Sequence, residues 1–135
     1  MSFITWTEQY ATSVPEMDEH HQHLFSLLNE LHEKVLACQT LEEEQELARV
    51  LLAELAEYAS YHFVAEERLM QECGFPGREA HCREHNLFRE RVAAMTETFA
   101  TNSVAMSFDT FRLLYDWIAE HVLVRDAEYV PYVGK

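Results

Sequence analysis

The chain has 135 residues, enough for one domain, and a helical bundle of this size can bury about two thirds of its unfolded surface. Its 24 Asp and Glu residues outnumber 10 Lys and Arg, and the formal net charge of -14 disfavours nucleic acids and anionic membrane surfaces as partners. No run approaches the roughly 18 apolar residues of a membrane span, and the first residues lack the basic and apolar regions of a secretory signal. We therefore expect no membrane span and a cytoplasmic location, with the three cysteines as reduced thiols.

Residues 1–17 predict an N-terminal arm, because they show no helical period and contain aromatic residues that could pack on a core. Asp18 is a candidate N-cap for a first helix over residues 18–38, since its carboxylate could accept hydrogen bonds from the free N–H groups of the first turn. Within this helix His21 precedes an apolar stripe, which predicts that its side chain faces the core. The stripe consists of Leu24, Leu28, Leu31 and Val35.

A second helix is predicted over residues 41–73. It follows a capping-box sequence at Thr40 and ends before a glycine and a proline. His62 and Glu66 lie one turn apart on its otherwise apolar face, so both side chains point toward the core. Because buried polar groups need partners, the histidine is either satisfied by hydrogen bonds within the core or part of a larger polar site.

Two further helices are predicted, over residues 78–100 and over residues 107–124 or slightly beyond. His81 and His85 lie one turn apart near the start of the third helix and lead another apolar stripe. His121 follows apolar residues of the fourth helix at spacings of three and four. Core-facing histidines on four helices favour a metal site over an isolated core histidine, because imidazole is a common metal ligand.

Short connections make neighbouring helices antiparallel, so the predicted fold is all-α, an up-down-up-down antiparallel four-helix bundle in a single domain. The predicted parts are the arm, residues 1–17, the bundle, residues 18–130, and a tail, residues 131–135. In this topology the core-facing histidines meet at one end of the bundle, level with Glu66. Asp126 lies five residues beyond His121, which rotates it about 140° from the histidine's face. Helical periodicity therefore leaves open whether this acid is solvated or reaches the site.

Five segments carry a resemblance to a known family. They are Trp6 in the arm, Asp18-Glu-His-His21, His62-Phe-Val-Ala-Glu66-Glu67-Arg-Leu-Met70, His81-Cys-Arg-Glu-His85 and Trp117-Ile-Ala-Glu-His121-Val-Leu-Val-Arg-Asp126. In this order and at these spacings, the chain resembles the hemerythrins, specifically the single-domain bacterial kind, over nearly its whole length. Ferritin-like di-iron proteins match less well, because their Glu-x-x-His pairs are absent from this sequence.

The resemblance implies a non-haem centre of two iron ions. Its terminal ligands would be His21, His62, His81, His85 and His121, and its bridges would be Glu66, Asp126 and an oxo or hydroxo group. His20 stands beside His21 and is the alternative ligand from the first helix, although the apolar stripe favours His21. One iron would have three histidines, whereas the other, held by His21 and His62, would keep an open position.

The function that the resemblance implies is reversible O2 binding by a carrier, store or local supplier, and not an enzyme. Apart from its ligands the site offers no general base or proton donor, which hydrolysis or oxygen activation would need. A di-iron oxidase, peroxidase or nitric oxide reductase, an O2 or redox sensor and an iron-storage module remain alternatives, and the sequence identifies no protein partner. The side chains that could form an apolar O2 pocket are Leu24, Phe25, Leu114, Trp117 and Ile118.

Overall fold

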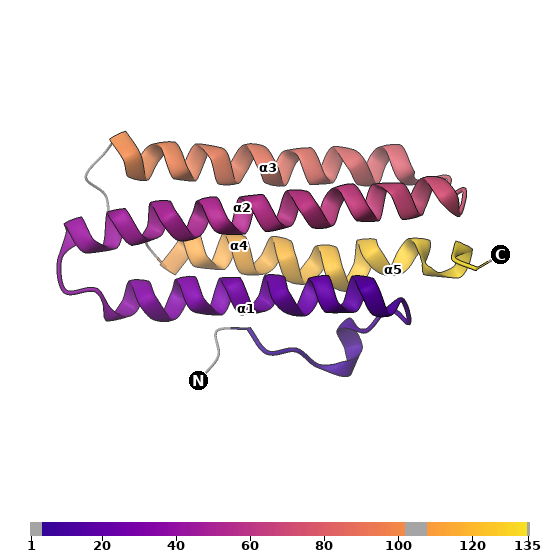
Figure 1. Cartoon of the computed structure of the whole chain (residues 1–135), viewed down its shortest axis with the longest axis horizontal. Coiled ribbons are helices and arrows are strands. Elements are labelled where there is room, and N and C mark those ends of the chain that lie inside the picture. Colours follow the sequence, from indigo (N-terminus) through magenta and orange to yellow (C-terminus); the bar gives the residue numbers. More distant parts are fainter. Residues whose placement is uncertain (1–3, 102–107, 135) are drawn as a thin grey trace.

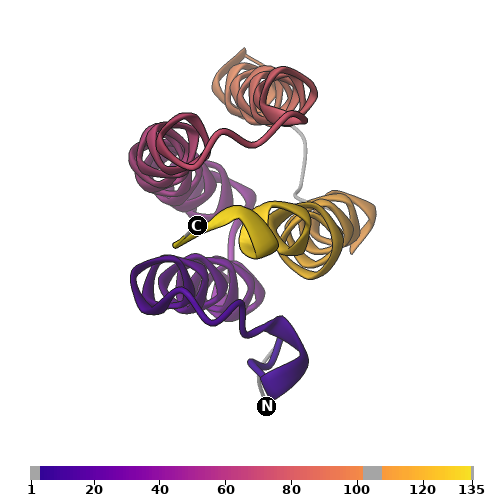
Figure 2. The same cartoon turned by 90° about the vertical axis from the view of Figure 1, so that its right-hand side faces the viewer.

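The structure, a computed structural model, describes residues 4–101 and 108–134 and contains four long antiparallel helices (Figure 1). These are α1 (Pro15–Ala37), α2 (Leu41–Glu72), α3 (Arg78–Thr101) and α4 (Phe108–Glu120). The chain continues from α4 without a loop into the π-helical segment η2 (His121–Arg125), then α5 (Asp126–Tyr129) and η3 (Val130–Tyr132). Seen from one end, the four helices surround a common interior (Figure 2). The prediction of an all-α antiparallel four-helix bundle is confirmed.

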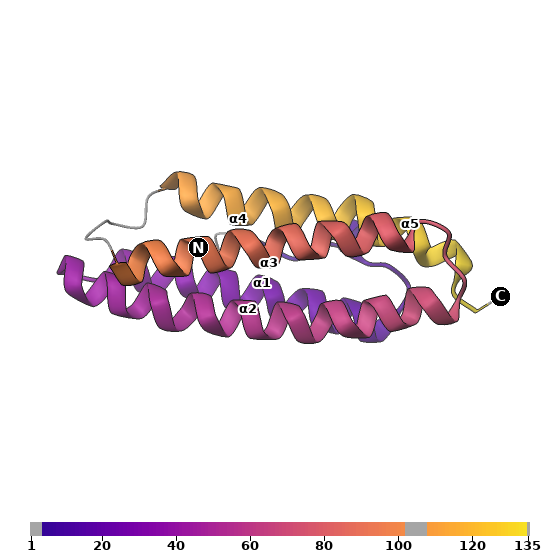
Figure 3. The same cartoon turned by 90° about the horizontal axis from the view of Figure 1, so that it is seen from above.

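One end of the bundle collects segments that are far apart in the sequence. The start of α1, the connection from α2 to α3, and α5 all lie at this end, as the view from above shows (Figure 3). The alternation of helix directions therefore places the last turns of α2 and α4 beside the first turns of α1 and α3. Residues 102–107, where the fourth helix was expected to begin, lie outside the described residues.

The first helix begins earlier than predicted. Its first residue is Pro15 and its N-cap is Val14, so the prediction of Asp18 as N-cap is wrong. Proline suits the first helical position because its fixed φ is already helical and its missing N–H would have had no intrahelical partner. The carboxylate of Asp18 instead accepts two hydrogen bonds from Thr12, from the backbone N–H and from the hydroxyl group, both at 2.8 Å. Asp18 thus ties the end of the arm to α1.

The start of α2 follows half of the predicted capping box. The hydroxyl oxygen of Thr40 accepts a hydrogen bond from the backbone N–H of Glu43 at 3.1 Å. The Glu43 carboxylate reaches back to the N–H of Gln39, at 3.3 Å, one residue before the expected partner. At the other end of α2, Gly74 adopts a φ of +69°, a left-handed conformation that glycine takes without steric cost.

The arm packs along the outside of α1 through polar and aromatic contacts. The side chain of Asn29 forms two hydrogen bonds with the backbone of Ile4 in the arm. Its Oδ1 accepts from the N–H of Ile4 at 2.8 Å, and its Nδ2 donates to the carbonyl of Ile4 at 2.8 Å. The rings of Trp6 and Tyr10 lie against Phe25, with ring centroids 5.5 and 4.9 Å away. The expectation that aromatic residues of the arm pack on the bundle is therefore met.

The hydrophobic core between the helices contains aliphatic and aromatic side chains of all four long helices. Among the residues that the structure describes, no helix combines the length and the apolar character needed to cross a membrane. Cys38, Cys73 and Cys82 are free thiols, as the sequence predicted.

Replacing Asn29 by Ala should lower the free energy of unfolding by about 1–3 kcal/mol, because two hydrogen bonds of about 0.5–1.5 kcal/mol each are lost together. Urea denaturation measures this change, and limited proteolysis should cut the arm faster. Ser26→Ala, an exposed position on the same helix, is the control. Equal stability of the two variants would show that the hydrogen bonds of Asn29 do not hold the arm.

Candidate metal centre

Seven polar side chains are buried together at the end of the bundle where α1 and α3 begin. All seven are at most 3 % exposed; they are His21, His62, Glu66, His81, His85, His121 and Asp126. Each of the four helices of the bundle contributes, α4 through its continuation in η2 and α5. The structure thus places every side chain of the expected ligand set in one cluster.

Helical spacing explains most of this convergence. His62 and Glu66 lie one turn apart on α2, and His81 and His85 lie one turn apart on α3, so each pair points in one direction. His21 faces the same interior from the second turn of α1. Antiparallel packing then brings these three faces to one level of the bundle, because late residues of α2 lie beside early residues of α1 and α3.

Asp126 reaches the cluster because the helix widens before it. The segment η2 is π-helical, and the backbone N–H of Asp126 donates to the carbonyl of His121, five residues earlier. This i to i+5 hydrogen bond brings the two residues roughly into line along the helix axis, which an α-helix would not do. Asp126 is therefore fully buried. The sequence left open whether this acid is solvated or reaches the site, and the structure places it at the site.

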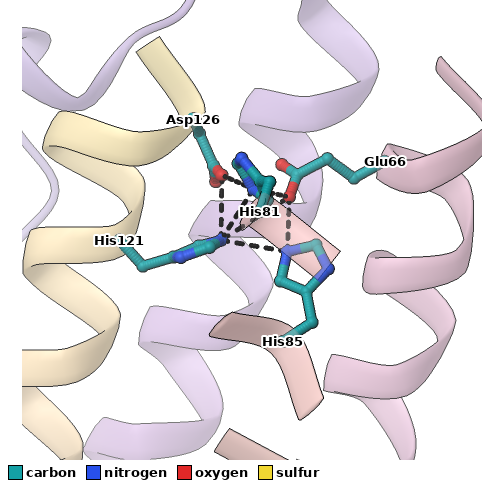
Figure 4. A group of neighbouring side chains, drawn as sticks. All are labelled: Glu66, His81, His85, His121 and Asp126. Atoms are coloured by element: carbon teal, nitrogen blue, oxygen red, sulfur yellow. Dashed lines mark hydrogen bonds and ion pairs between the residues drawn. The ribbon is translucent and has the colours of Figure 1, made fainter. Parts of the chain in front are cut away.

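The carboxylate of Glu66 lies between two sets of histidines. Its Oε1 is 2.9 Å from Nε2 of His81 and 2.9 Å from Nε2 of His85 (Figure 4). Its Oε2 is 3.4 Å from Nε2 of His62 and 3.8 Å from Nε2 of His21. Each oxygen of this side chain therefore faces a different set of nitrogens.

Asp126 repeats this arrangement from the opposite helix. Its Oδ1 is 3.0 Å from Nε2 of His81 and from Nε2 of His121, and its Oδ2 is 2.8 Å from Nε2 of His21. Two overlapping groups result, each with ligand atoms within 4.8 Å of one another. The first contains Glu66, Asp126, His81, His85 and His121, and the second contains Glu66, Asp126, His21 and His62. Both carboxylates belong to both groups.

Several buried atoms of the cluster lack a hydrogen-bond partner. Both oxygens of Asp126, Nε2 of His21 and Nε2 of His62 are close to other polar atoms but form no hydrogen bond of acceptable geometry. Such atoms cost free energy when they are buried without a partner, whereas metal coordination would satisfy them. Imidazole nitrogen together with carboxylate oxygen suits iron, zinc, copper or nickel. The residues present therefore fit a centre of two metal ions.

The electrostatics of the metal-free cluster differ from those of isolated side chains. Burial disfavours the charged form of His21, but Asp126 and Glu66 outweigh it and raise the pKa to about 9. The same balance raises the pKa of His81 to about 9 and that of His121 to about 10. Burial likewise opposes ionisation of the two carboxylates, yet the neighbouring histidines hold both carboxyl pKa values below their usual range. Without metal, protonated histidines thus neutralise the buried acids.

Glu67 and Tyr129 are partners of the cluster that were not identified from the sequence. Glu67 receives a hydrogen bond from Nδ1 of His85 at 2.8 Å, and the hydroxyl group of Tyr129 donates to Oε2 of Glu66 at 2.9 Å. Tyr129 lies one turn after Asp126, a spacing that could have indicated it. Glu67 directly follows Glu66, and only its contact with another helix distinguishes it from the many solvated acids.

Aromatic rings fix two of the histidines from the side. Phe63 stacks on His85 with ring centroids 3.9 Å apart and an interplanar angle of 8°. Trp117 stacks on His121 at 4.5 Å and 9°. These contacts limit rotation of the imidazole rings, so their nitrogens stay directed at the cluster.

An apolar cavity of about 10 Å³, room for about one molecule of the size of water, borders His62 and His121. Its other lining residues are Leu24, Ala59, Phe63, Phe88, Trp117, Ile118 and Val122. Three of the five expected pocket residues are among them, but Phe25 and Leu114 are not. The ring of Phe25 is turned toward the arm, and Leu114 lies one turn further from His121 than Trp117 and Ile118 do.

The remaining histidines lie outside both groups. His20 is 5 % exposed, and its Nδ1 lies 2.9 Å from Nδ1 of His62 and not in the cluster. The ring of His23 lies against Tyr58. The structure therefore brings His21, and not its neighbour His20, among the carboxylate oxygens.

Comparison with known proteins gives a consistent family assignment. The family described as Hemerythrin HHE cation binding domain matches residues 12–133. The chain is 30% identical to a bacteriohemerythrin of Methylococcus capsulatus, over 97% of both chains. It is 22% identical to a myohemerythrin of Theromyzon tessulatum, over 92% of this chain and 88% of that protein.

Solved structures agree with these relatives. A wild-type hemerythrin crystal structure superposes with a TM-score of 0.86 at 28% identity, covering 99% of this chain and 100% of the other. A hemerythrin mutant gives a TM-score of 0.87 at 29% identity, with complete coverage of both chains. The match of the family over most of the sequence, the shared fold and the buried histidine and carboxylate cluster lead to one conclusion: the chain belongs to the hemerythrin family.

Proposed function

We propose that this chain binds two iron ions and uses them to bind O2 reversibly, as an O2 carrier, store or local supplier. The observation that carries the proposal is the geometry of the carboxylates: Glu66 and Asp126 each direct one oxygen to each group of histidines. Such side chains can bridge two ions. The proposed terminal ligands are His21, His62, His81, His85 and His121, and an oxo or hydroxo group would complete the bridges.

The two groups of ligands differ in a way that suits binding of an outside molecule. One group has three histidines, and the other has only His21 and His62. An ion in the second group would keep one more position free, and the apolar cavity borders His62. Ferrous ions held there would supply the electrons that O2 accepts on binding. The surrounding apolar side chains exclude water and protons, which favours release of unchanged O2.

The lining of the cavity also favours binding over turnover. None of its lining residues is an acid, a lysine, a tyrosine or a cysteine. The hydroxyl group of Tyr129 is engaged with Glu66, and burial raises its pKa, so it stays protonated and is a poor proton donor. An oxidase or peroxidase would need a group that delivers protons to the bound oxygen species. The proposal therefore places the protein among O2-binding proteins and not among enzymes.

We also propose that the chain acts as a single domain in the cytoplasm, where reducing conditions keep its three free thiols reduced. The net charge of -14 makes nucleic acid an unfavourable partner. O2 is the ligand, and no protein partner is proposed.

Anaerobic reconstitution with ferrous iron should give about two irons per chain, and the reduced protein should take up one O2 per centre and release most of it under vacuum. Metal analysis and the visible spectrum before and after degassing measure both quantities. Irreversible consumption of O2, or turnover that depends on an added substrate, would support the enzyme alternatives. A protein that holds zinc alone after growth in iron-replete medium would contradict the proposal.

Replacing Asp126 by Ala tests whether this carboxylate binds the metal, because the substitution removes one oxygen from each group of ligands. It should lower the iron content and abolish reversible O2 uptake. Asp116→Ala is the control, since Asp116 is an exposed acid on α4 that pairs with Arg112 at 3.1 Å. Equal iron content in the two variants would show that Asp126 is not a ligand.

The metal-free protein should lose stability as the pH rises from 6.5 to 10. Its raised histidine pKa values, about 9 for His21 and His81 and about 10 for His121, mean that the folded chain binds more protons than the unfolded chain in this range. Stability from these groups is complete below about pH 6.5, the ordinary histidine pKa, and is lost as the pH passes 9 to 10. Thermal unfolding at several pH values measures the effect.

The iron-loaded protein should not show this decline, because metal-bound histidines have already lost the protons concerned. Parallel stability curves for the two forms between pH 6.5 and 10 would mean that these histidines do not bind the metal.

A further inference from the structure

His20 makes a buried contact with a proposed ligand that the metal site itself does not explain. Its ring stands edge-on to that of His62, with centroids 5.0 Å apart and an interplanar angle of 87°. The two Nδ1 atoms are 2.9 Å apart, and the residues are 5 % and 1 % exposed. His20 belongs to neither group of ligand atoms. Any role of His20 at the metal site would therefore run through His62, the proposed ligand that it contacts.

The chemistry of imidazole decides which ring donates. Two ring nitrogens at 2.9 Å form a hydrogen bond only if one carries a proton and the other offers a lone pair. Nε2 of His62 faces the cluster, where it would need its lone pair for a metal. A neutral His62 then carries its proton on Nδ1 and donates it to His20. His20 must be neutral to accept this bond, and its own proton is on Nε2, which lies 4.0 Å from Oε1 of Glu16.

We propose that His20 is a positioning residue for the metal centre: its Nδ1 accepts the Nδ1–H of His62 and thereby holds His62 in the tautomer and orientation that direct Nε2 at the metal. The inference rests on the proposed function, since it assigns His62 to an iron. Hydrogen bonds donated by the second ring nitrogen of a ligating histidine fix its ring and tune its basicity.

His20 is itself held in place by two tyrosines of α2. The ring of Tyr61 lies 5.3 Å from that of His20, and the ring of Tyr58 stands nearly perpendicular to it at 6.0 Å. Both tyrosines lie on the same helix as His62, within one turn of it, so α2 carries the donor and also packs against the acceptor on α1. The contact does not depend on a loop.

The acceptor at His62 differs in charge from the acceptor at His85. Nδ1 of His85 donates to the carboxylate of Glu67 at 2.8 Å, whereas Nδ1 of His62 donates to a neutral imidazole. A carboxylate acceptor makes the ligating imidazole more basic and more electron-rich, and a neutral acceptor does so less. His62 would thus be a less electron-rich ligand than His85, which would favour the ferrous state of an iron bound to it.

Three substitutions of His20 separate the parts of this proposal. His20→Gln keeps a neutral acceptor, His20→Leu removes the acceptor, and His20→Glu supplies a charged one. His20→Leu should weaken iron binding by about 10–100-fold in competition with a chelator, the usual effect of removing such a partner, and His20→Gln should restore most of it. His20→Glu should keep the iron but lower the reduction potential and speed oxidation to the ferric form.

Two further measurements complete the test. Glu67→Gln is the matched control at the other group, where replacing a charged acceptor by a neutral one should raise the reduction potential, opposite to His20→Glu. In the metal-free protein labelled with 15N-histidine, NMR should show a proton shared between the two Nδ1 atoms in the parent and no such proton in His20→Leu. Circular dichroism establishes that each variant folds, and if His20→Leu does not, the comparison of His20→Glu with His20→Gln decides.

The outcomes distinguish this proposal from the proposed function. A parent that binds two irons while His20→Leu and His20→Glu match it in affinity, potential and oxidation rate would overturn the role of His20 and leave the iron site intact. A parent that binds no iron would overturn the proposed function and the role of His20 with it.

Discussion

Two carboxylates buried in the interior of a helical bundle are the constraint on which this end of the molecule depends. Glu66 and Asp126 are fully buried, and removing a charged carboxylate from water costs several kcal/mol even after relaxation. His21, His81 and His121 offset that cost as protonated partners in the metal-free chain, and the five surrounding histidines would offset it as metal ligands in the loaded one. Stacking aromatic rings and partners such as Tyr129 then hold the acids and histidines in one arrangement.

Much of this arrangement could be predicted from the sequence, because it follows from the α-helical period. The one-turn spacings of His62 with Glu66 and of His81 with His85 place each pair on one face, and short connections set the helices antiparallel. Those two rules bring the histidines to the same end of the bundle. The same period failed at Asp126, and there only the resemblance to the hemerythrins assigned the acid to the site.

The features that could not be predicted depend on local irregularity or on contacts between helices. The π-helical turn before Asp126 has no glycine, proline or other recognised signal, so an α-helical rule gave the wrong rotation. The first helix begins early, at Pro15, so Asp18 lies inside the helix and binds Thr12 of the arm instead of capping the first turn. The contact of His20 with His62 joins two helices, and a residue far away in the sequence cannot be chosen as a partner from spacing alone.

Anomalous diffraction at the iron edge, from crystals of the iron-loaded protein, would show directly whether two iron ions share Glu66 and Asp126. We expect two iron positions, one bounded by three histidines and the other by His21 and His62, with both carboxylates in contact with both ions. A single iron position, or two ions that do not share these carboxylates, would rule out a shared di-iron centre.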